Sequence, residues 1–315
     1  MSSEIEYDIK LDRYIEYLDD LSSNNNIKKA KVIFFKIFDR FVELRKKNKK
    51  IASGQIAEIA SIAEQFEYDY MQIELYDYLI DGADVGYGYI LKGQYFEKKS
   101  KFEYAENMYK KAMRYGGEYK LYAYKNLGYM YDYKDDTENA IECYEKVLEI
   151  EIDPTIALYL GSIYERKDNL ERALEMTKLS YENGLPNYMV EFNLGVIYGR
   201  LGNYVKAERH YIESIRLNPN YGYSYLNLAV QYRTLGDYKF AIKVLKKGIN
   251  NNQYESYLHY NIACYYAHEN DLEKSAYHIE ISLSLNAKLK AEACGDSDLK
   301  LLRDNEIYKS YFIDD

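Results

Sequence analysis

Two side chains stand at a spacing that could hold a metal ion or activate a thiol. Cys264 and His268 are four residues apart, so on a helix they would share one face. A metal site needs at least three protein ligands, and the sequence offers no third ligand to complete this pair. The other interpretation is a packed cysteine beside a surface histidine. We therefore expect no metal site and no cofactor.

The remaining candidates for catalysis are carboxylates and glycines. The acidic run from Asp132 to Glu138 could pair carboxylates for acid–base chemistry, but it also has the composition of a solvated turn between two helices. The glycine-rich stretch from Gly82 to Gly88 follows an expected helix rather than a strand, so we interpret it as a link. No P-loop, dinucleotide-binding, zinc-protease or nucleophile-elbow motif occurs in the sequence. We expect no catalytic residue and no enzymatic activity.

Charge and composition exclude further classes of protein. The 315 residues include 42 Lys and Arg against 51 Asp and Glu, for a net charge of −9, which argues against a protein that coats nucleic acid or an anionic membrane. No stretch approaches the roughly 18 consecutive apolar residues of a membrane-spanning helix. Three distant cysteines without a Cys-x-x-Cys spacing fit a reducing cytoplasm. We expect a cytoplasmic protein with no nucleic-acid or membrane partner.

The elements that position these side chains follow a repeat of about 34 residues. A bulky residue and a small one recur as pairs, an aromatic follows three residues after the small one, and a second small residue comes nine further on. The pairs are Lys92-Gly93, Leu127-Gly128, Leu160-Gly161, Leu194-Gly195, Leu228-Ala229 and Ile262-Ala263. Four residues after the second small residue stand Tyr109, Tyr144, Thr177, Tyr211, Leu245 and Ile279.

This pattern predicts a helical hairpin in each copy. The bulky residue, the glycine and the aromatic lie along one side of a first helix, and the glycine lets a second helix approach closely. Turn-forming residues separate the two helices, and the prolines fall in the links between hairpins. The turn formers are Ser100, Asp135, Asp168, Gly202, Gly236 and Asn270.

These residues resemble the tetratricopeptide repeat, whose period and Leu-Gly-x-x-Tyr…Ala pattern they match. The copy from Tyr188 to Asn220 is the closest match, with Asn193-Leu-Gly-Val-Ile-Tyr198 followed by Ala207, Tyr211 and Pro219. The resemblance implies an all-α, right-handed solenoid of helical hairpins. Its six copies would span residues 86–120, 121–153, 154–187, 188–221, 222–255 and 256–287.

Both flanks of the array are also predicted to be helical. Residues 1–85 would form an N-terminal region that includes a degenerate repeat, and residues 288–315 a helical cap over the last hairpin. A long apolar helix from Lys28 to Lys46 must pack on something, with Val32, Phe35, Phe38 and Val42 at helical spacing and Ile33, Ile37, Phe41 and Leu44 beside them. The apolar side chains expected to serve the cap are Leu299, Leu301, Leu302, Ile307, Tyr308, Tyr311 and Phe312.

The resemblance also implies a concave inner face, lined by the first helices, that holds a segment of another protein. Asn193, Asn227 and Asn261 occupy the same inner position in consecutive copies, and Asn126 occupies it in an earlier one. A side-chain amide pairs with any peptide bond, and such a row is similar to the asparagine ladder of O-linked N-acetylglucosamine transferases, although the same asparagines could serve local packing. The aromatic residues at inner positions include Tyr129, Tyr133, Phe192, Tyr223, Tyr257 and Tyr260.

Arginines recur on the same face. Arg166, Arg200 and Arg233 are almost evenly spaced and would suit an acidic peptide, or they could bridge neighbouring repeats. The leading hypothesis is therefore a non-catalytic scaffold that binds another protein or peptide, with an acidic segment as one candidate ligand. Two alternatives are a peptide-sensing regulator with an N-terminal effector region and an accessory subunit that presents substrate to a partner enzyme.

Overall fold

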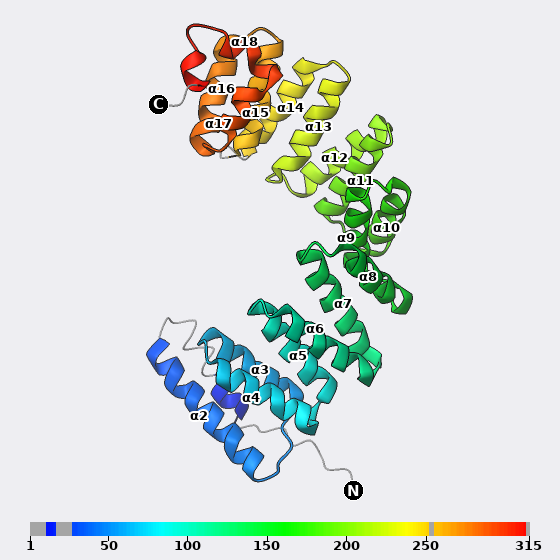
Figure 1. The fold of residues 1–315 in the computed structure, drawn as a ribbon, viewed down its shortest axis with the longest axis vertical. Coiled ribbons are helices and arrows are strands. Elements are labelled where there is room, and N and C mark those ends of the chain that lie inside the picture. The colour runs from blue at the N-terminus through cyan, green and yellow to red at the C-terminus, as the bar shows by residue number, and fades with distance from the viewer. Residues whose placement is uncertain (1–10, 17–26, 252–254, 313–315) are drawn as a thin grey trace. The chain divides into compact units, whose positions relative to one another are not determined.

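The structure of the chain is a computed structural model, which describes residues 11–16, 27–251 and 255–312. The described residues form an all-α fold of paired helices, which confirms the predicted class (Figure 1). The chain divides into two compact units, residues 1–151 and residues 152–315.

The first unit contains an N-terminal helical region and two hairpins. The N-terminal helices are α2 (Ile27–Lys46), α3 (Ser53–Gln65) and α4 (Asp69–Tyr78). The first hairpin pairs α5 (Val85–Lys98) with α6 (Phe102–Ala112), and the second pairs α7 (Gly117–Tyr133) with α8 (Thr137–Ile150). The stretch around Gly82 is a single π-helical turn, Leu79–Ala83, that connects α4 to α5.

The second unit consists of four hairpins and a C-terminal segment. The first helices of the hairpins are α9 (Pro154–Arg166), α11 (Tyr188–Arg200), α13 (Gly222–Thr234) and α15 (Ser256–His268). Their partners are α10 (Leu170–Asn183), α12 (Tyr204–Leu217), α14 (Tyr238–Asn251) and α16 (Leu272–Leu285). The C-terminal segment contains α17 (Leu289–Gly295), α18 (Lys300–Arg303) and the short 3-10 turns Ser297–Leu299 and Lys309–Phe312.

The glycine of each hairpin lies against the bulky residue of the second helix, as its spacing predicted. A Cβ atom at Gly195 would lie 2.6 Å from Cδ1 of Tyr211, closer than real side-chain carbons approach. Gly93 and Gly128 contact Tyr109 and Tyr144 in the same way. In the last two hairpins Ala229 and Ala263 replace the glycine, and there Leu245 and Ile279 replace the tyrosine. Gly161 meets Thr177 just as closely, so the four glycines mark hairpins in which the second helix approaches the first too closely for a side chain.

The turns inside the hairpins confirm the predicted turn residues. Ser100, Asp135, Asp168 and Asn270 have φ between 57° and 62°, the left-handed conformation that ends a helix, and Gly202 and Gly236 occupy the equivalent turns with φ of 76° and 82°. The next residue donates its N–H to the carbonyl of the aromatic that belongs to the pattern, as Asn203 does to Tyr198 at 2.8 Å. Each first helix therefore ends in a Schellman-type cap that fixes the start of the second.

Helix α2 is packed, as expected, by one of its apolar faces. Its buried residues are Ala30, Phe34, Ile37, Phe38, Phe41 and Leu44, which form the core with α3 and α4. Val32 is 56% exposed and Phe35 is 43% exposed. Because α2 carries apolar residues around most of its circumference, periodicity alone did not single out the face that packs.

The C-terminal segment covers the last hairpin with part of the predicted set. Leu299 and Leu302 are fully buried in the core of the second unit, whereas Leu301 and Ile307 are 55% and 76% exposed and point away from it.

Within the last hairpin, the Nδ1 atoms of His259 and His278 lie 3.0 Å apart. Burial lowers the pKa of His278 to about 4, with smaller contributions from His259 and Lys246. His278 is therefore neutral near pH 7.

Candidate functional site

The candidate site is the set of inner positions on the first helices, and its amides do not form one uniform row. In the second unit, Asn227 and Asn261 have the same geometry: each donates Nδ2 to the backbone carbonyl four residues earlier, at 2.9 Å, on Tyr223 and Tyr257. Asn193 instead donates Nδ2 to Ser162 Oγ at 2.8 Å, which ties α11 to α9. The structure thus places two equivalent amides on successive helices, and a third that serves packing between repeats.

The aromatic residues at inner positions also divide into two groups. Tyr223 and Tyr257 are 55% and 42% exposed, and their own backbone carbonyls accept the hydrogen bonds from the two amides. Phe192 is half-buried, and its ring packs edge-on against Tyr221 with ring centroids 5.2 Å apart. Tyr260 is 5% exposed and turned toward the C-terminal segment. Tyr223 and Tyr257 are therefore the predicted rings of this unit that are most open to a ligand.

Among the predicted arginines, Arg200 and Arg233 form ion pairs within the second unit. Arg200 on α11 donates to the carbonyl oxygen of Glu165 at 2.7 Å, to the carboxylate of the same residue, and to Asp168 Oδ1 at 2.6 Å. Arg233 on α13 lies 3.3 Å from Asp298 Oδ2. Arg166 is exposed on α9. Arg200 thus connects α11 to the end of α9, the bridging role that the sequence left open.

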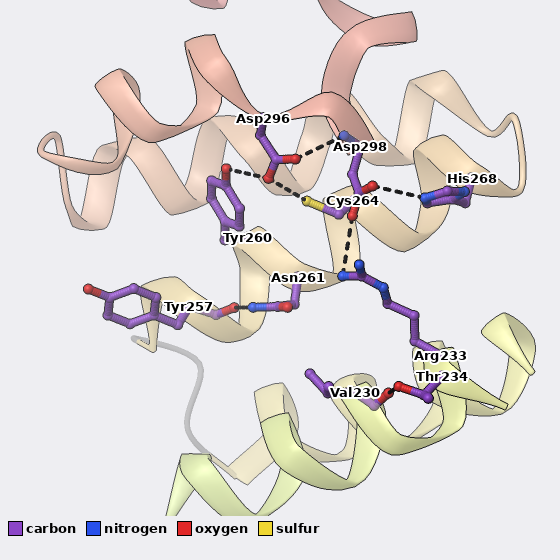
Figure 2. A network of polar contacts seen from close by, with 10 residues as sticks. All are labelled: Val230, Arg233, Thr234, Tyr257, Tyr260, Asn261, Cys264, His268, Asp296 and Asp298. Atoms are coloured by element: carbon purple, nitrogen blue, oxygen red, sulfur yellow. Dashed lines mark hydrogen bonds and ion pairs between the residues drawn. The ribbon is translucent and has the colours of Figure 1, made fainter. Parts of the chain in front are cut away.

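An acidic turn of the C-terminal segment covers part of the inner face of α15 (Figure 2). Asp296 Oδ2 accepts the hydroxyl of Tyr260 at 2.8 Å and lies 3.8 Å from Cys264 Sγ. Asp298 Oδ1 lies 3.1 Å from His268 Nε2, and its other oxygen faces Arg233 of α13. Sequence reasoning missed this contact, and only the acidic Asp296-Ser-Asp298 run beside the predicted cap hinted at it.

Cys264 and His268 therefore contact two different carboxylates, those of Asp296 and Asp298. Burial, followed by the charge of Asp296, raises the pKa of the Cys264 thiol far above its usual range. Burial and the hydrogen bond to Asp296 raise the pKa of Tyr260 in the same way. Cys264 is 3% exposed and stays a protonated, packed thiol. The arrangement anchors the C-terminal segment and offers no nucleophile.

The first unit has its own inner surface, a cavity of about 550 Å³ over α5 and α7. Asn126 forms its wall, donating Nδ2 to the carbonyl of Tyr122 at 2.7 Å and accepting from Gln94 Nε2 at 3.1 Å. Tyr133 is 81% exposed at the rim, and Tyr129, with 36% exposure, packs edge-on against Tyr144. The remaining lining residues are Glu97, Lys98, Ser100 and Phe102.

Glu97 is the partly buried acidic group of this cavity. Its Oε2 accepts the hydroxyl of Tyr109 at 2.6 Å, and burial raises the pKa of the carboxyl above its ordinary value despite that hydrogen bond. Lys98, at the edge of the cavity, is paired with Glu64 of α3. Amide, phenol and carboxyl groups thus line the pocket with both donors and acceptors, a composition that suits a polar peptide segment.

Comparison with known proteins agrees with this geometry. The tetratricopeptide repeat family model matches residues 121–153 and 189–221, the hairpins of α7–α8 and α11–α12. The chain is a tetratricopeptide repeat protein. A similar solved structure is the C-terminal part of a tetratricopeptide repeat-containing protein from Cytophaga hutchinsonii, with 19% identity, a TM-score of 0.58 and coverage of 72% of this chain and 94% of that one.

A second similar structure is a chain of the APC/C hetero-tetramer Cut9–Hcn1. The alignment covers 97% of this tetratricopeptide repeat chain and 60% of that chain, with 18% identity and a TM-score of 0.55. At these identities the matches establish the fold. No curated protein matches the sequence.

Two further properties of the described residues concern membranes and metals. Over the described parts of the chain, every helix is too short or too polar to cross a membrane. Among the same residues, three or more His, Cys, Asp or Glu side chains nowhere gather in the way that a metal ion requires.

Proposed function

We propose that this tetratricopeptide repeat protein is a non-catalytic interaction module, and that the inner face of its second unit holds an extended peptide segment of a partner protein. The observation that carries the proposal is the identical geometry of Asn227 and Asn261. Because one N–H of each Nδ2 is bonded to its own helix, each amide offers a ligand Oδ1 as an acceptor and the second N–H as a donor. Two oriented acceptors on successive helices suit the N–H groups of an extended backbone.

The exposed tyrosines supply the apolar part of such an interface. Tyr223 and Tyr257 stand one repeat apart beside the two amides, and each carries a large ring with few rotatable bonds. Rings of this kind contact ligand side chains at a modest cost in conformational entropy. The pairing of one amide with one tyrosine, repeated on α13 and α15, would read the peptide backbone while tolerating variation in its side chains.

Charge argues against carboxylates as the main feature recognised on this face. Arg200 already holds Glu165 and Asp168, and Arg233 holds Asp298. An acidic ligand would have to displace these internal partners and would gain little net electrostatic energy. The acidic partner suggested by the arginine series is therefore not our choice for this face.

The test is a selection of peptides from a random library on the immobilised chain, followed by calorimetric titration of the selected peptides. We expect the double variant Asn227→Ala/Asn261→Ala to weaken binding about tenfold or more, since each lost hydrogen bond is worth about 1 kcal/mol. Asn193 stays unaltered because its amide serves Ser162. Equal affinities for wild type and double variant would refute the role of the amides.

The matched control is Asn183→Ala. Asn183 is exposed on the second helix α10 and donates Nδ2 to the carbonyl of Leu179, four residues earlier, at 2.8 Å. Its removal deletes the same intrahelical bond without touching the inner face. We expect the control to bind as the wild type does. If it lost affinity as the double variant did, the loss would reflect helix stability and not ligand contact.

A further inference from the structure

The second unit carries a groove outside the inner face, of about 910 Å³, between α12 and α14. Its floor is α13, which contributes Tyr225, Leu228 and Tyr232. These three residues are spaced three and four apart and lie on the side of α13 opposite Asn227. We call this feature the outer groove. It is separate from the surface to which the proposed function belongs.

The outer groove is apolar at its floor and along its walls. Tyr225 and Leu228 are 1% and 4% exposed, so the floor belongs to the core. Ile212 on α12 and Phe240 on α14 stand on the two walls and are 51% and 40% exposed. Large apolar side chains that remain exposed above a recessed apolar floor mark a surface that another apolar element can cover.

The rim of the groove is basic in a protein whose net charge is −9. Arg216, Lys243, Lys246 and Lys247 line it, against the single acidic residue Glu208. Glu208 accepts the hydroxyl of Tyr232 at 2.5 Å, and Arg216 is paired with Glu213.

The three lysines come from α14, a helix that contains four lysines and no acidic residue. Lys243 and Lys246 lie 5.5 Å from the ring centroids of Phe240 and Tyr266. Within the described part of the chain, none of the three forms an ion pair. Their charges are thus available to a partner, in contrast to those of Arg200 and Arg233 on the inner face.

We propose that the outer groove binds an acidic amphipathic helix of a partner protein. Apolar side chains spaced i, i+3, i+4 and i+7 on that helix would cover Ile212, Leu228 and Phe240, and its flanking carboxylates would pair with Lys243, Lys246 and Lys247. A recessed floor flanked by side chains of α12 and α14 can seat a helix roughly 10 Å across, whereas a flat bilayer would touch only the rim. The net charge of the whole chain also disfavours an anionic membrane.

The experiment measures binding of a labelled, stapled helical peptide of about 15 residues, built from leucine at i, i+3, i+4 and i+7 with alanine and flanking glutamates. Fluorescence anisotropy is recorded with the full chain at low and at high salt. We expect saturable binding that weakens with salt, and at least about tenfold weaker binding to the variant Lys243→Glu/Lys246→Glu/Lys247→Glu. A peptide with lysines in place of the glutamates should not bind.

Two further variants separate the groove from general charge. The variant Lys178→Glu/Lys206→Glu/Lys288→Glu makes the same change in net charge with exposed lysines that lie outside the groove, and it should bind like the wild type. Ile212→Asp, at a half-exposed position of the wall, should weaken binding without unfolding the chain. Circular dichroism checks the fold of each variant.

Three binding results would overturn the proposal. The acidic peptide could fail to bind the wild type at low salt, the two triple-lysine variants could lose affinity equally, or the chain could bind phosphatidylserine vesicles in preference to the peptide. Self-association of the chain that consumes the groove, seen by sedimentation and abolished by Ile212→Asp, would also overturn it in favour of a second copy as occupant. None of these results bears on the inner-face amides, so this proposal and the proposed function fail independently.

Discussion

The contact between Gly195 and Tyr211 gives the sharpest test of how the hairpins are packed. In Gly195→Ala, the new methyl group would lie 2.6 Å from the ring carbons Cδ1 and Cε1 of Tyr211. Alanine in place of glycine inside a helix gains roughly 0.5–1 kcal/mol, but overpacking a core costs about 1–3 kcal/mol. We expect a net loss of about 1–2 kcal/mol in the free energy of unfolding.

The chain itself suggests the rescue. In the next hairpin Ala229 stands where Gly195 does, and Leu245 stands where Tyr211 does. Tyr211→Leu alone should be destabilising because it removes a buried ring. In that background, however, Gly195→Ala should become neutral or stabilising, with a coupling energy of about 2 kcal/mol between the two sites.

Urea denaturation followed by circular dichroism measures these changes, and hydrogen exchange in α11 and α12 shows whether they are local. Gly199→Ala is the matched control on the same helix, because its methyl group would meet no atom nearer than 3.7 Å. We expect it to be neutral or to stabilise by up to about 0.5–1 kcal/mol. If Gly195→Ala were tolerated as well as Gly199→Ala, the close-approach argument would be refuted.

Three further predictions concern the burial of individual side chains. Burial lowers the pKa of His278 to about 4 in the folded chain, so between about pH 6.5 and 4 the unfolded chain binds a proton that the folded chain does not. Acidification through this range should therefore lower the free energy of unfolding by about 1–2 kcal/mol. Urea titrations at each pH should show that His278→Gln does not lose this stability. Cys294, which is exposed, should react with a thiol reagent in the native protein, whereas Cys143 and Cys264, both buried, should react only on unfolding. Thr177→Val should raise stability by about 1 kcal/mol in thermal melts, since the buried Oγ1 of Thr177 has no hydrogen-bond partner among the described residues.

Local rules succeeded where the interaction partners lie within one hairpin. The turn residues Asp168 and Gly202 were recognisable because a helix that ends in a left-handed residue needs a short polar side chain or none. The glycine opposite Tyr211 was recognisable because its partner follows at a fixed spacing in the same repeat. These features depend on contacts between residues fewer than about 20 positions apart.

Periodicity failed where it could not rank one face of a helix above another. In α2 the sequence shows apolar residues around most of the helix, and the structure buries Phe38 and Phe41 but leaves Val32 and Phe35 exposed. The choice depends on how α3 and α4 present their own apolar side chains, and no spacing within α2 contains that information.

The sequence by itself determined the all-α fold and the pairing of helices into hairpins, because both follow from helix geometry and from contacts inside one repeat. For the side chains that the sequence assigns to an inner face, only the tertiary structure decided which groups they contact. Asn193 donates to Ser162 of another repeat, whereas Asn227 and Asn261 each donate to a carbonyl of their own helix, and Arg233 is held by a carboxylate about 65 residues away. A side chain pairs with whatever group the folded chain brings within hydrogen-bond distance, and sequence spacing does not specify that distance across repeats.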